Sequence, residues 1–491
     1  INGFYFNERK HWLNDDYVKF IRYSEYLINK NEEGILAFIN PHGFLDNTTF
    51  RGMRYHLLKT FDIIYTIDLH GNGNKKEVAP DGSKDENVFD IMQGVSINIF
   101  VKKKSKSKKL ADVYHYDLYG KRDFKYSFLD DNSLKTIKWK KLDYSEPNYF
   151  FVKKDFDVKN EYIDSFSTTE IFKLNSVGVV TSLDKVVLAD NIESLAYQIN
   201  NYGEEFEESF VKKYLYRPFE EKYIYYKTNL LGRSREKIMK NYFKDNIGLI
   251  ISKQFGGHQH FITLITNKIN DKSSQAFAPY YNHPLYLYSD EKSLTNERTP
   301  NLNLEIVKEI EEKLGLKFVN EKIEDSTTFA PIDILDYIYA VLHSPSYREK
   351  YKEFLKIDFP RVPYPKPETF WQLVSLGGKL RSLHLLEDTS LDERIIDIKG
   401  EGELLIKNSL NKKDFSIEDE KVELRLNDEV SVVNIPLVAW EFYIGGYQPA
   451  QKWLKDRVGR VLNRADMKHY NRIINALCKT DLIMKKIDEV L

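Results

Sequence analysis

The sequence predicts an α/β domain at the N-terminal end, followed by a longer α+β region. Within the first 69 residues, two segments with helical periodicity alternate with two continuous apolar runs of strand length. This alternation is typical of an α/β fold with a mainly parallel sheet. From about residue 110, short strand-like pieces rich in tyrosine, phenylalanine and lysine replace the alternation, and long helical patterns return only after residue 303.

The first predicted helix covers residues 14–30. Asn14 is its candidate N-cap, and Asp15 and Asp16 in the first turn would interact favourably with the helix dipole. Positions that repeat every three or four residues define the face that we expect to be buried: Tyr17, Phe20, Ile21, Ser24 and Leu27 or Ile28.

Strands and a second helix follow. Residues 35–39, ILAFI, and residues 61–69, FDIIYTIDL, are apolar runs of the length expected for strands buried on both faces. Between them, Asn47 is the candidate N-cap of a helix whose apolar face holds Phe50, Met53, Arg54, Leu57 and Leu58. Residues 95–103 alternate in the manner of a third strand, with these side chains expected to point inward: Val95, Ile97, Ile99 and Val101.

The remaining sequence predicts further helices at residues 303–314, 332–343, 346–355 and 368–386, with Gly315 as the C-cap of the first. A β stretch is expected around residues 402–444 and a helical end over residues 449–491. Four of the 15 prolines fall within residues 360–367, which indicates a boundary or a stiff connection. We therefore expect three segments: residues 1–109, 110–365 and 366–491.

The composition limits the classes of function. Lysine and arginine number 73, aspartate and glutamate 74, so nucleic-acid binding has to come from local cation clusters rather than from the overall field. The single cysteine, Cys478, excludes a disulfide framework and a cysteine-rich zinc cluster. No apolar run reaches the roughly 18 residues of a membrane helix, so we expect a cytoplasmic protein. The sequence opens on Ile1, as expected for a piece of a longer polypeptide.

The turn Asn40-Pro41-His42-Gly43 follows the first strand. In amino-group methyltransferases, an Asn/Asp-Pro-Pro-aromatic turn accepts hydrogen bonds from the exocyclic amine and stacks on the extruded base. Here His42 and Gly43 replace the second proline and the aromatic, and no glycine-rich cofactor loop precedes the turn. A simple strand-end turn is the favoured interpretation, and a degenerate active site at Asn40 and Pro41 is the alternative.

Five segments carry a resemblance to a known family. Residues 34–72 and 85–103 resemble the C-terminal half of an adenine-N6 DNA methyltransferase of the γ arrangement, and more closely of those fused into type ISP restriction–modification enzymes. Three further segments resemble the target-recognition and C-terminal regions of the same enzymes: LYRPFEEKYIYY (215–226), DYIYAVLHSPSYREKYKEFLKIDFPRVPYP (336–365) and GGYQPAQKWLKDRVGRVL (445–462).

The resemblance implies a fold and a role for each segment. Residues 1–109 would be the C-terminal half of a methyltransferase domain with a partial Rossmann-like sheet. Residues 110–365 would be a target-recognition domain, mixed β and then helical, and residues 366–491 its C-terminal part. In that family the catalytic Asn-Pro-Pro-Tyr turn precedes the helix that matches residues 14–30. The chain would then lack the catalytic turn and the cofactor loop, and Asn40-Pro41 would match a later, non-catalytic strand end.

The resemblance also implies partners. The intact protein would transfer a methyl group from S-adenosylmethionine to adenine N6 of double-stranded DNA, and would carry nuclease and helicase-like domains upstream, with no membrane partner. This chain alone would bind no cofactor. Phe89 matches the aromatic that packs on the flipped adenine, although it could equally be a core residue at a strand start. The alternative is a separate DNA-binding specificity subunit without catalytic activity.

Three cation clusters are candidate DNA-binding surfaces. The first is the lysine run that begins with Lys102, Lys103 and Lys104, which could also be a solvated linker. The second is a turn and helix start with Arg233, Arg235 and Lys237, which could also be a solvated loop. The third is the face of a C-terminal helix on which we expect Trp453 to be followed by Arg457, Arg460 and Arg464, with ion pairing to another domain as the alternative.

A glycine turn between strands is the candidate for reading bases. It combines a cation, two amides and two imidazoles: Lys253, Gln254, His258, Gln259 and His260. A purely structural turn is the alternative. The two histidines could face one way, but no third ligand is evident nearby, so we expect no metal site.

Overall fold

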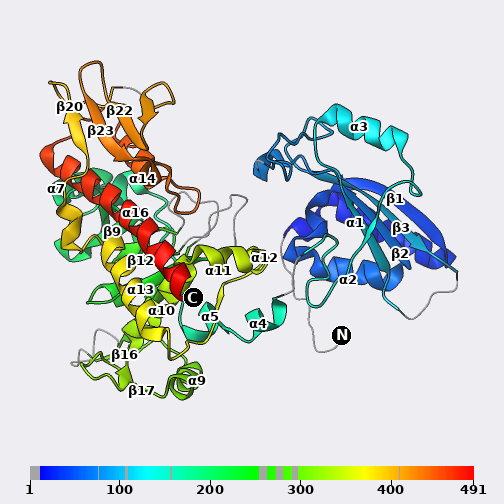
Figure 1. Cartoon of the computed structure of the whole chain (residues 1–491), viewed down its shortest axis with the longest axis horizontal. Helices are drawn as coiled ribbons and strands as arrows, with labels where there is room; N and C mark the ends of the chain where they lie inside the picture. Colours follow the sequence, from blue (N-terminus) through cyan, green and yellow to red (C-terminus); the bar gives the residue numbers. More distant parts are fainter. Residues whose placement is uncertain are drawn as a thin grey trace. The chain divides into compact units, whose positions relative to one another are not determined.

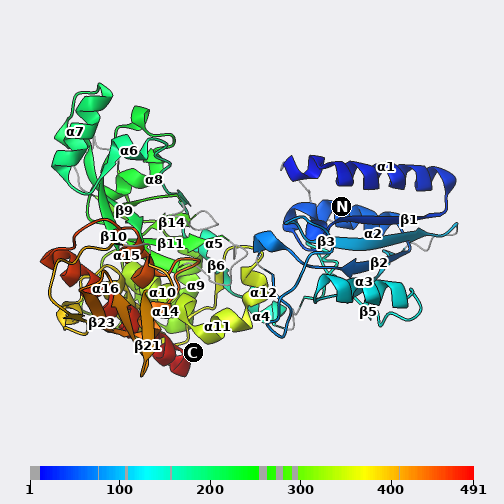
Figure 2. The same cartoon turned by 90° about the horizontal axis from the view of Figure 1, so that it is seen from above.

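The computed structural model describes residues 11–75, 77–104, 109–154, 158–253, 263–272, 280–289, 297–407 and 410–491. The chain forms two compact units, residues 1–156 (unit 1) and residues 157–491 (unit 2). Both are mixed α/β structures (Figures 1 and 2). Among the described residues we find no helix that combines the length and the apolar character of a membrane span.

Unit 1 contains one five-stranded sheet with the strand order β1-β3-β2-β4-β5. Strand β3 is antiparallel to both β1 and β2, and β2 is parallel to β4. Strands β1, β2 and β4 therefore share one direction, and the expectation of a mainly parallel sheet is wrong for β3. The elements are α1 (Asp16–Asn31), β1 (Gly34–Pro41), α2 (Arg51–Thr60), β2 (Ile63–Asp68), β3 (Val95–Lys102), β4 (Asp112–Asp117), α3 (Arg122–Asp131) and β5 (Lys140–Lys141).

The two faces of this sheet are covered unequally. Helices α1 and α2 pack on one face through a core that includes Ile21, Leu57 and Phe100. Figure 2 shows α1 and α3 on opposite sides of the sheet. Helix α3 covers part of the second face, where Phe128 stacks on Tyr116 of β4. The first face is thus closed. The second is closed over β4 and part of β2 and β3, and it is open over β1.

Three expectations about which side chains of unit 1 are buried are wrong. Phe20 was expected on the buried face of α1 but is 59% exposed. Strand β1 is not buried on both faces, because Ile35 is 68% and Ile39 50% exposed. In β3 the prediction holds only for Val95, which is buried: Phe100 and its same-face neighbours are buried as well, whereas Ile97, Ile99 and Val101 are only half-buried. The reason is that Phe100, the largest side chain of β3, lies on the face under α1 and α2.

The first domain boundary lies later in the chain than composition suggested. We expected it after residue 109, but β4 extends the sheet by pairing with β2. The backbone N–H of Phe151 donates to the carbonyl of Leu45 at 2.8 Å, and Arg54 donates to the carbonyl of Asn148. Residues 110–154 therefore belong to unit 1 although their composition differs.

Unit 2 contains thirteen helices among its described residues. They are α4 (Lys159–Ile163), α5 (Thr168–Ile171), α6 (Asp184–Val187), α7 (Ile192–Tyr202), α8 (Glu236–Met239), α9 (Leu304–Leu314), α10 (Pro331–His343), α11 (Pro345–Lys350), α12 (Lys352–Leu355), α13 (Phe370–His384), α14 (Leu437–Glu441), α15 (Pro449–Lys455) and α16 (Arg464–Val490). Helix α9 confirms its prediction, since Gly315 ends it in the left-handed conformation with φ +65°.

The described strands of unit 2 form three four-stranded sheets and three small ladders. The first sheet contains β13 (Ile269–Asn270), β9 (Val211–Arg217), β10 (Glu220–Tyr225) and β8 (Leu188–Ala189). The second contains β12 (Thr263–Thr266), β11 (Gly248–Ser252), β14 (Tyr280–Pro284) and β7 (Ser176–Val177). The third contains β20 (Asp397–Lys399), β23 (Ser431–Pro436), β22 (Lys421–Arg425) and β21 (Phe415–Glu418). The ladders pair β15 (Tyr286–Tyr288) with β16 (Arg298–Pro300), β17 (Lys317–Phe318) with β18 (Thr328–Phe329), and β19 (Arg361–Val362) with β6 (Phe166–Ser167).

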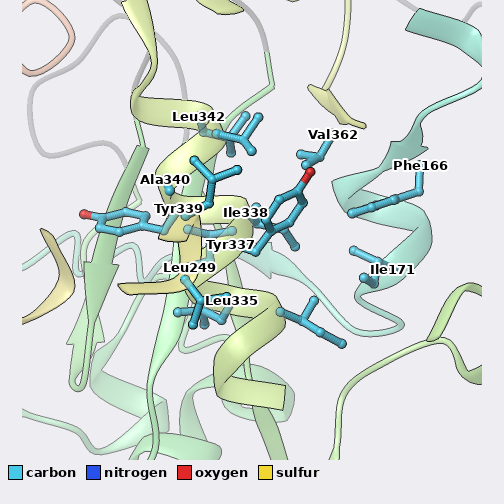
Figure 3. Close-up of a cluster of buried hydrophobic side chains, with 14 of the residues drawn as sticks. Phe166, Ile171, Leu249, Leu335, Tyr337, Ile338, Tyr339, Ala340, Leu342 and Val362 are labelled. Carbon is cyan, nitrogen blue, oxygen red and sulfur yellow. The ribbon is translucent and has the colours of Figure 1, made fainter. Parts of the chain in front are cut away.

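Helix α10 is the centre of the main core of unit 2. Almost all of its residues are buried, and Figure 3 shows its side chains surrounded by residues from β11, α5 and β19. Helix α13 approaches it so closely that a Cβ on Gly377 would lie 1.9 Å from the carbonyl oxygen of Asp336. The Asp336 carboxylate accepts two hydrogen bonds from Arg381 of α13, at 2.7 and 3.0 Å.

The expected boundary after residue 365 does not separate two compact units. Helix α16, drawn in red in Figure 1, packs against α13 and α10. His384 of α13 accepts from the Tyr339 hydroxyl at Nδ1 and donates from Nε2 to Thr480 of α16 at 2.8 Å. Residues on both sides of the proline-rich connection thus share one core.

Two buried histidines make the stability of unit 2 depend on pH. Burial lowers the pKa of His283 to about 4 and that of His384 to about 3. The unfolded chain, with a histidine pKa of about 6.5, binds more protons than the folded chain below that pH. Stability should therefore be fully present above about pH 6.5 and decrease as the pH falls towards 4, by up to about 1.4 kcal/mol per pH unit for each histidine. Urea unfolding between pH 7 and 4.5 measures this. A His384→Gln chain should lose part of the dependence, and an equally steep dependence in that chain would contradict the assignment.

Candidate nucleic-acid interface

Polar side chains gather at one edge of the sheet in unit 1. Strands β1, β2 and β4 share a direction, so their carboxyl ends meet at this edge, which is where α/β sheets place their sites. His42 follows β1 and its Nδ1 lies 2.9 Å from the carboxylate of Asp68, the last residue of β2. His70 lies 3.0 Å from Asp117 through Nε2 and 2.9 Å from Glu77 through Nδ1.

Charges in this cluster stabilise one another. Burial alone would lower the pKa of His70, but hydrogen bonds to Asp117 and Glu77 outweigh it and raise that pKa to about 10. Burial would raise the pKa of Glu77, and the hydrogen bond and charge of His70 instead lower it. The pKa of Asp117 is lowered in the same way by His115 and His70. The cluster therefore holds an imidazolium between carboxylates.

Asn40 is not arranged to receive a substrate amine. Its side chain is buried, its amide oxygen accepts from Asn98 at 2.8 Å, and its amide nitrogen donates to the carbonyl of Pro41 at 2.9 Å. The two oxygens that a catalytic turn would offer to an amine are thus both engaged within the protein. This supports the interpretation of Asn40-Pro41 as a strand-end turn.

Phe89 lies at the surface, on the loop between β2 and β3. Its side chain is 44% exposed, whereas its neighbour Val88 is buried. Its backbone is held on both sides, because its N–H donates to Asn87 and its carbonyl accepts from Arg122 at 3.1 Å. An exposed ring on an anchored backbone favours a binding role over the core interpretation.

Two of the cation clusters keep exposed charges. Lys103 and Lys104 are exposed, while Lys102 donates to the Asn29 side chain at 2.5 Å. Arg233 and Lys237 are exposed as well. The described parts of both clusters thus remain candidates for phosphate contact.

The turn at residues 232–235 ends in a very short helix. Arg235 is half-buried with φ +57° and precedes α8, which has a single turn. Such a short helix has a weak dipole, so phosphate binding there would depend on the side chains.

The glycine turn is described only at its first residue. Lys253 is exposed and lies 3.6 Å from the Asp358 carboxylate. Gln254, His258, Gln259 and His260 lie outside the described residues. Base reading by this turn stays a prediction.

The predicted C-terminal helix with an arginine face is not formed as a single helix. Helix α15 ends at Lys455, and α16 begins at Arg464. Between them the backbone pairs with residues 404–406: the N–H of Gly459 donates to the carbonyl of Ile406, and that of Leu462 to the carbonyl of Leu404. Gly459 has φ +83°, a conformation incompatible with an α-helix. Extended pairing therefore replaces the helix that the spacing predicted.

The three arginines have separate environments. Arg457 is largely buried: its guanidinium lies 3.8 Å from the Trp453 ring centroid and 3.4 Å from Glu220 of β10. Arg460 forms two hydrogen bonds with Asp466, and Arg464 is exposed. Arg457 thus has the ion-pairing role left open as the alternative, here within unit 2. DNA contact by Arg460 and Arg464 stays a prediction.

The sequence analysis missed the cluster of His42, Asp68 and His70. Each residue ends or follows an apolar run, and parallel strands bring such ends together. The spacing Asp-x-His after residues 61–67 was therefore an available signal. The partner of Arg457 was not foreseeable, because Glu220 is far away in the sequence.

The fold of this chain is similar to that of three solved structures over nearly the whole length of the chain. The first is the cryoEM structure of a DrdV–DNA complex, with a TM-score of 0.75 and 21% identity, covering 98% of this chain and 52% of that chain. The second is the ATP-dependent Type ISP restriction–modification enzyme LlaBIII bound to DNA, with a TM-score of 0.74 and 20% identity, covering 97% of this chain and 34% of that chain. The third is a nuclease-deletion mutant of the Type ISP restriction–modification enzyme LlaGI in complex with a DNA substrate mimic, with a TM-score of 0.71 and 20% identity, covering 96% of this chain and 40% of that chain. At these identities the similarity shows a shared fold. No curated protein sequence matches the chain significantly.

The family follows from the sequence of unit 2. Residues 198–486 match the model of the Type ISP C-terminal specificity domain. This match covers more than half of the 491 residues, so the chain belongs to that family. The chain spans about half the length of the DrdV chain and about a third of the LlaBIII chain.

The network around Arg457 gives a prediction about stability. Replacing Arg457 by alanine leaves the buried carboxylate of Glu220 without its arginine, which should lower the free energy of unfolding by about 3 kcal/mol. Arg464→Ala, at an exposed position, should change it by less than about 0.5 kcal/mol. Urea unfolding of both chains measures the difference. Adding Glu220→Gln to Arg457→Ala should recover part of the loss, and equal effects of the two arginine changes would refute the network.

Proposed function

We propose that this chain recognises the DNA target in a site-specific adenine-N6 DNA methyltransferase of a restriction–modification protein, and supplies part of the target-base pocket. Support comes from the family match of unit 2 and from similar structures that are DNA complexes. The exposed cations described above would hold the phosphates. Phe89, exposed on its anchored loop, would stack on the flipped adenine.

One observation on unit 1 supports a place in a larger methyltransferase sheet: its second face is apolar and partly uncovered. Ile35 and Ile39 of the edge strand β1 are 68% and 50% exposed. In the antiparallel register, Ile35 lies opposite Val101 and Ile39 opposite Ile97, which places all four on the same face. A contiguous exposed apolar area of this kind marks an interaction surface.

The outer side of α1 has the same character. Phe20, Tyr23 and Tyr26 are 59%, 62% and 52% exposed, and they extend along the helix. Strand β1 also presents a free edge among the described strands of its sheet. An edge strand next to uncovered apolar side chains can take a further strand and its covering helix.

We therefore assign these surfaces to an upstream methyltransferase half of the same polypeptide. The alternative, a separate specificity subunit, is less well supported, because it would leave this apolar surface in contact with water. Nuclease and helicase-like domains further upstream belong to the same proposal, since the similar chains are two to three times as long.

S-adenosylmethionine would be bound mainly by that upstream half. The described residues do not fit it. Gly71 and Gly73 follow β2, but they lead into a 3-10 turn instead of an α-helix. A Cβ on Gly71 would meet the Asn87 backbone at 2.4 Å, so no open cradle exists there.

The uncovered surface provides a test in the intact protein. Ile35→Glu together with Ile39→Glu would place two charges in the proposed contact with the upstream half, so methyl transfer from labelled S-adenosylmethionine to adenine should fall at least about 100-fold. In the 491-residue chain, the same changes should alter the free energy of unfolding by less than about 0.5 kcal/mol, because both side chains are exposed.

Ile417 is the matched control. It is 50% exposed on β21 of unit 2, so Ile417→Glu introduces one such charge outside the proposed surface and should leave methyl transfer unchanged. Full activity in the Ile35/Ile39 variant would refute the assignment of this surface. Absence of adenine methylation by the unmodified intact protein would refute the proposed activity itself.

A further inference from the structure

We propose that His42, Asp68 and His70 form a binding site for one divalent transition-metal cation of the zinc type. The site lies at the carboxyl edge of the sheet in unit 1. It goes beyond the proposed DNA recognition and does not depend on it.

The ligand atoms converge on one point. One atom from each of the three residues lies within 4.8 Å of the other two. His42 Nδ1 is 2.9 Å and His70 Nδ1 3.8 Å from the Asp68 carboxylate. With metal–ligand bonds of about 2.0–2.1 Å, two ligand atoms of a tetrahedral ion lie roughly 3.3 Å apart. The two distances are to different oxygens of Asp68, Oδ1 for His42 and Oδ2 for His70, and they lie on either side of this value, so small side-chain movements would bring one oxygen and both nitrogens around an ion.

The other nitrogen of each imidazole has a partner of the kind found in metal sites. His70 Nε2 lies 3.0 Å from the Asp117 carboxylate, and His42 Nε2 lies 3.0 Å from the Asn72 amide. Histidine ligands usually donate their second N–H to a carboxylate or an amide oxygen, which fixes the ring. When a cation replaces the proton on His42 Nδ1, the Asn72 amide must present its oxygen to Nε2–H.

Glu77 lies beside the site. Its Oε1 lies 2.9 Å from His70 Nδ1, the atom that also faces Asp68, while its Oε2 accepts from the Asn72 backbone. The mixture of two imidazoles and one carboxylate suits zinc and similar cations. Asp68, Glu77 and Asp117 all lie close to His70, and a divalent cation bound at Nδ1 would replace the proton there as the counter-charge of these carboxylates.

The backbone fixes these side chains in advance. Asp68 ends β2 and also accepts from the backbone N–H of His70 at 2.9 Å. A Cβ on Gly94 would lie 2.5 Å from the His42 ring, so glycine is required for the ring to lie there. The same loop, residues 69–94, carries Phe89. A bound cation would therefore stabilise the base of the loop that holds the proposed stacking residue.

The experiment uses the 491-residue chain after treatment with EDTA and desalting. Titration with ZnCl₂ against a chromophoric chelator should show one equivalent bound. His70→Gln should weaken binding more than tenfold, and Asp117→Asn, which changes a shared partner of His70 and His115 but no ligand, should weaken it about 10- to 100-fold. His56→Gln is the matched control, because His56 contacts Glu25 elsewhere in unit 1 and should not affect binding.

Two further measurements test whether other histidines hold the cation and whether a loss of binding is caused by misfolding. His258→Gln with His260→Gln should retain the full equivalent. Co²⁺ added to the unmodified chain should show the visible absorption of a cation bound by nitrogen and oxygen ligands, which decides the matter if His70→Gln fails to fold. No stoichiometric binding, a Co²⁺ spectrum of the hydrated ion, or equal losses in His70→Gln and His56→Gln would overturn the proposal and leave a hydrogen-bond network only.

Discussion

The antiparallel pairing of β3 between β1 and β2 determines the arrangement of unit 1. Its register places Phe100 opposite Leu36 and Ile64, on the face covered by α1 and α2. The same register places Ile97 and Val101 on the other face, with the exposed isoleucines of β1. Because β3 runs against its neighbours, the carboxyl ends of β1 and β2 lie at one edge, where His42 meets Asp68. One ladder thus defines the closed face, the open face and the polar edge.

A comparable constraint holds unit 2 together. Helix α10 is buried on all sides, and α13 and α16 pack against it from a part of the chain that begins after the proline-rich connection. The ion pair of Arg457 with Glu220 adds a contact between the C-terminal segment and β10. The family match spans these same elements, from residue 198 to residue 486.

The parts of the fold that the sequence predicted well are those decided by local signals. Helix α9 ends at Gly315 as expected, because a left-handed C-cap is a local property. Strand β2 is largely buried, as its apolar run indicated, although Ile63 and Tyr65 are only half-buried. The exposed face of β1 was not predictable, since burial depends on what lies over the sheet, and an apolar run looks the same whether or not it is covered.

In other places the prediction was wrong although the sequence held a local signal against it, because the helical spacing was given more weight. The helical spacing from Trp453 to Arg464 ignored Gly459 and the capping box formed by Asn463 and Asp466, which marks the start of a new helix. The polar edge was missed because its residues come from three separate strands. Base stacking by Phe89 and phosphate contact by the exposed cations stay predictions, because they depend on a nucleic acid that sequence spacing does not position.

DNA binding by the 491-residue chain tests the central claim most directly. Selection from a pool of duplexes of random sequence identifies the sequence that the chain prefers. Fluorescence anisotropy with this sequence and with unrelated duplexes then gives the ratio of the two affinities. The account predicts that one sequence binds at least about 10³-fold more tightly than unrelated duplexes, and that affinity falls steeply with salt as phosphate contacts are screened. Binding that is equal for all sequences, or independent of salt, would contradict a role in target recognition.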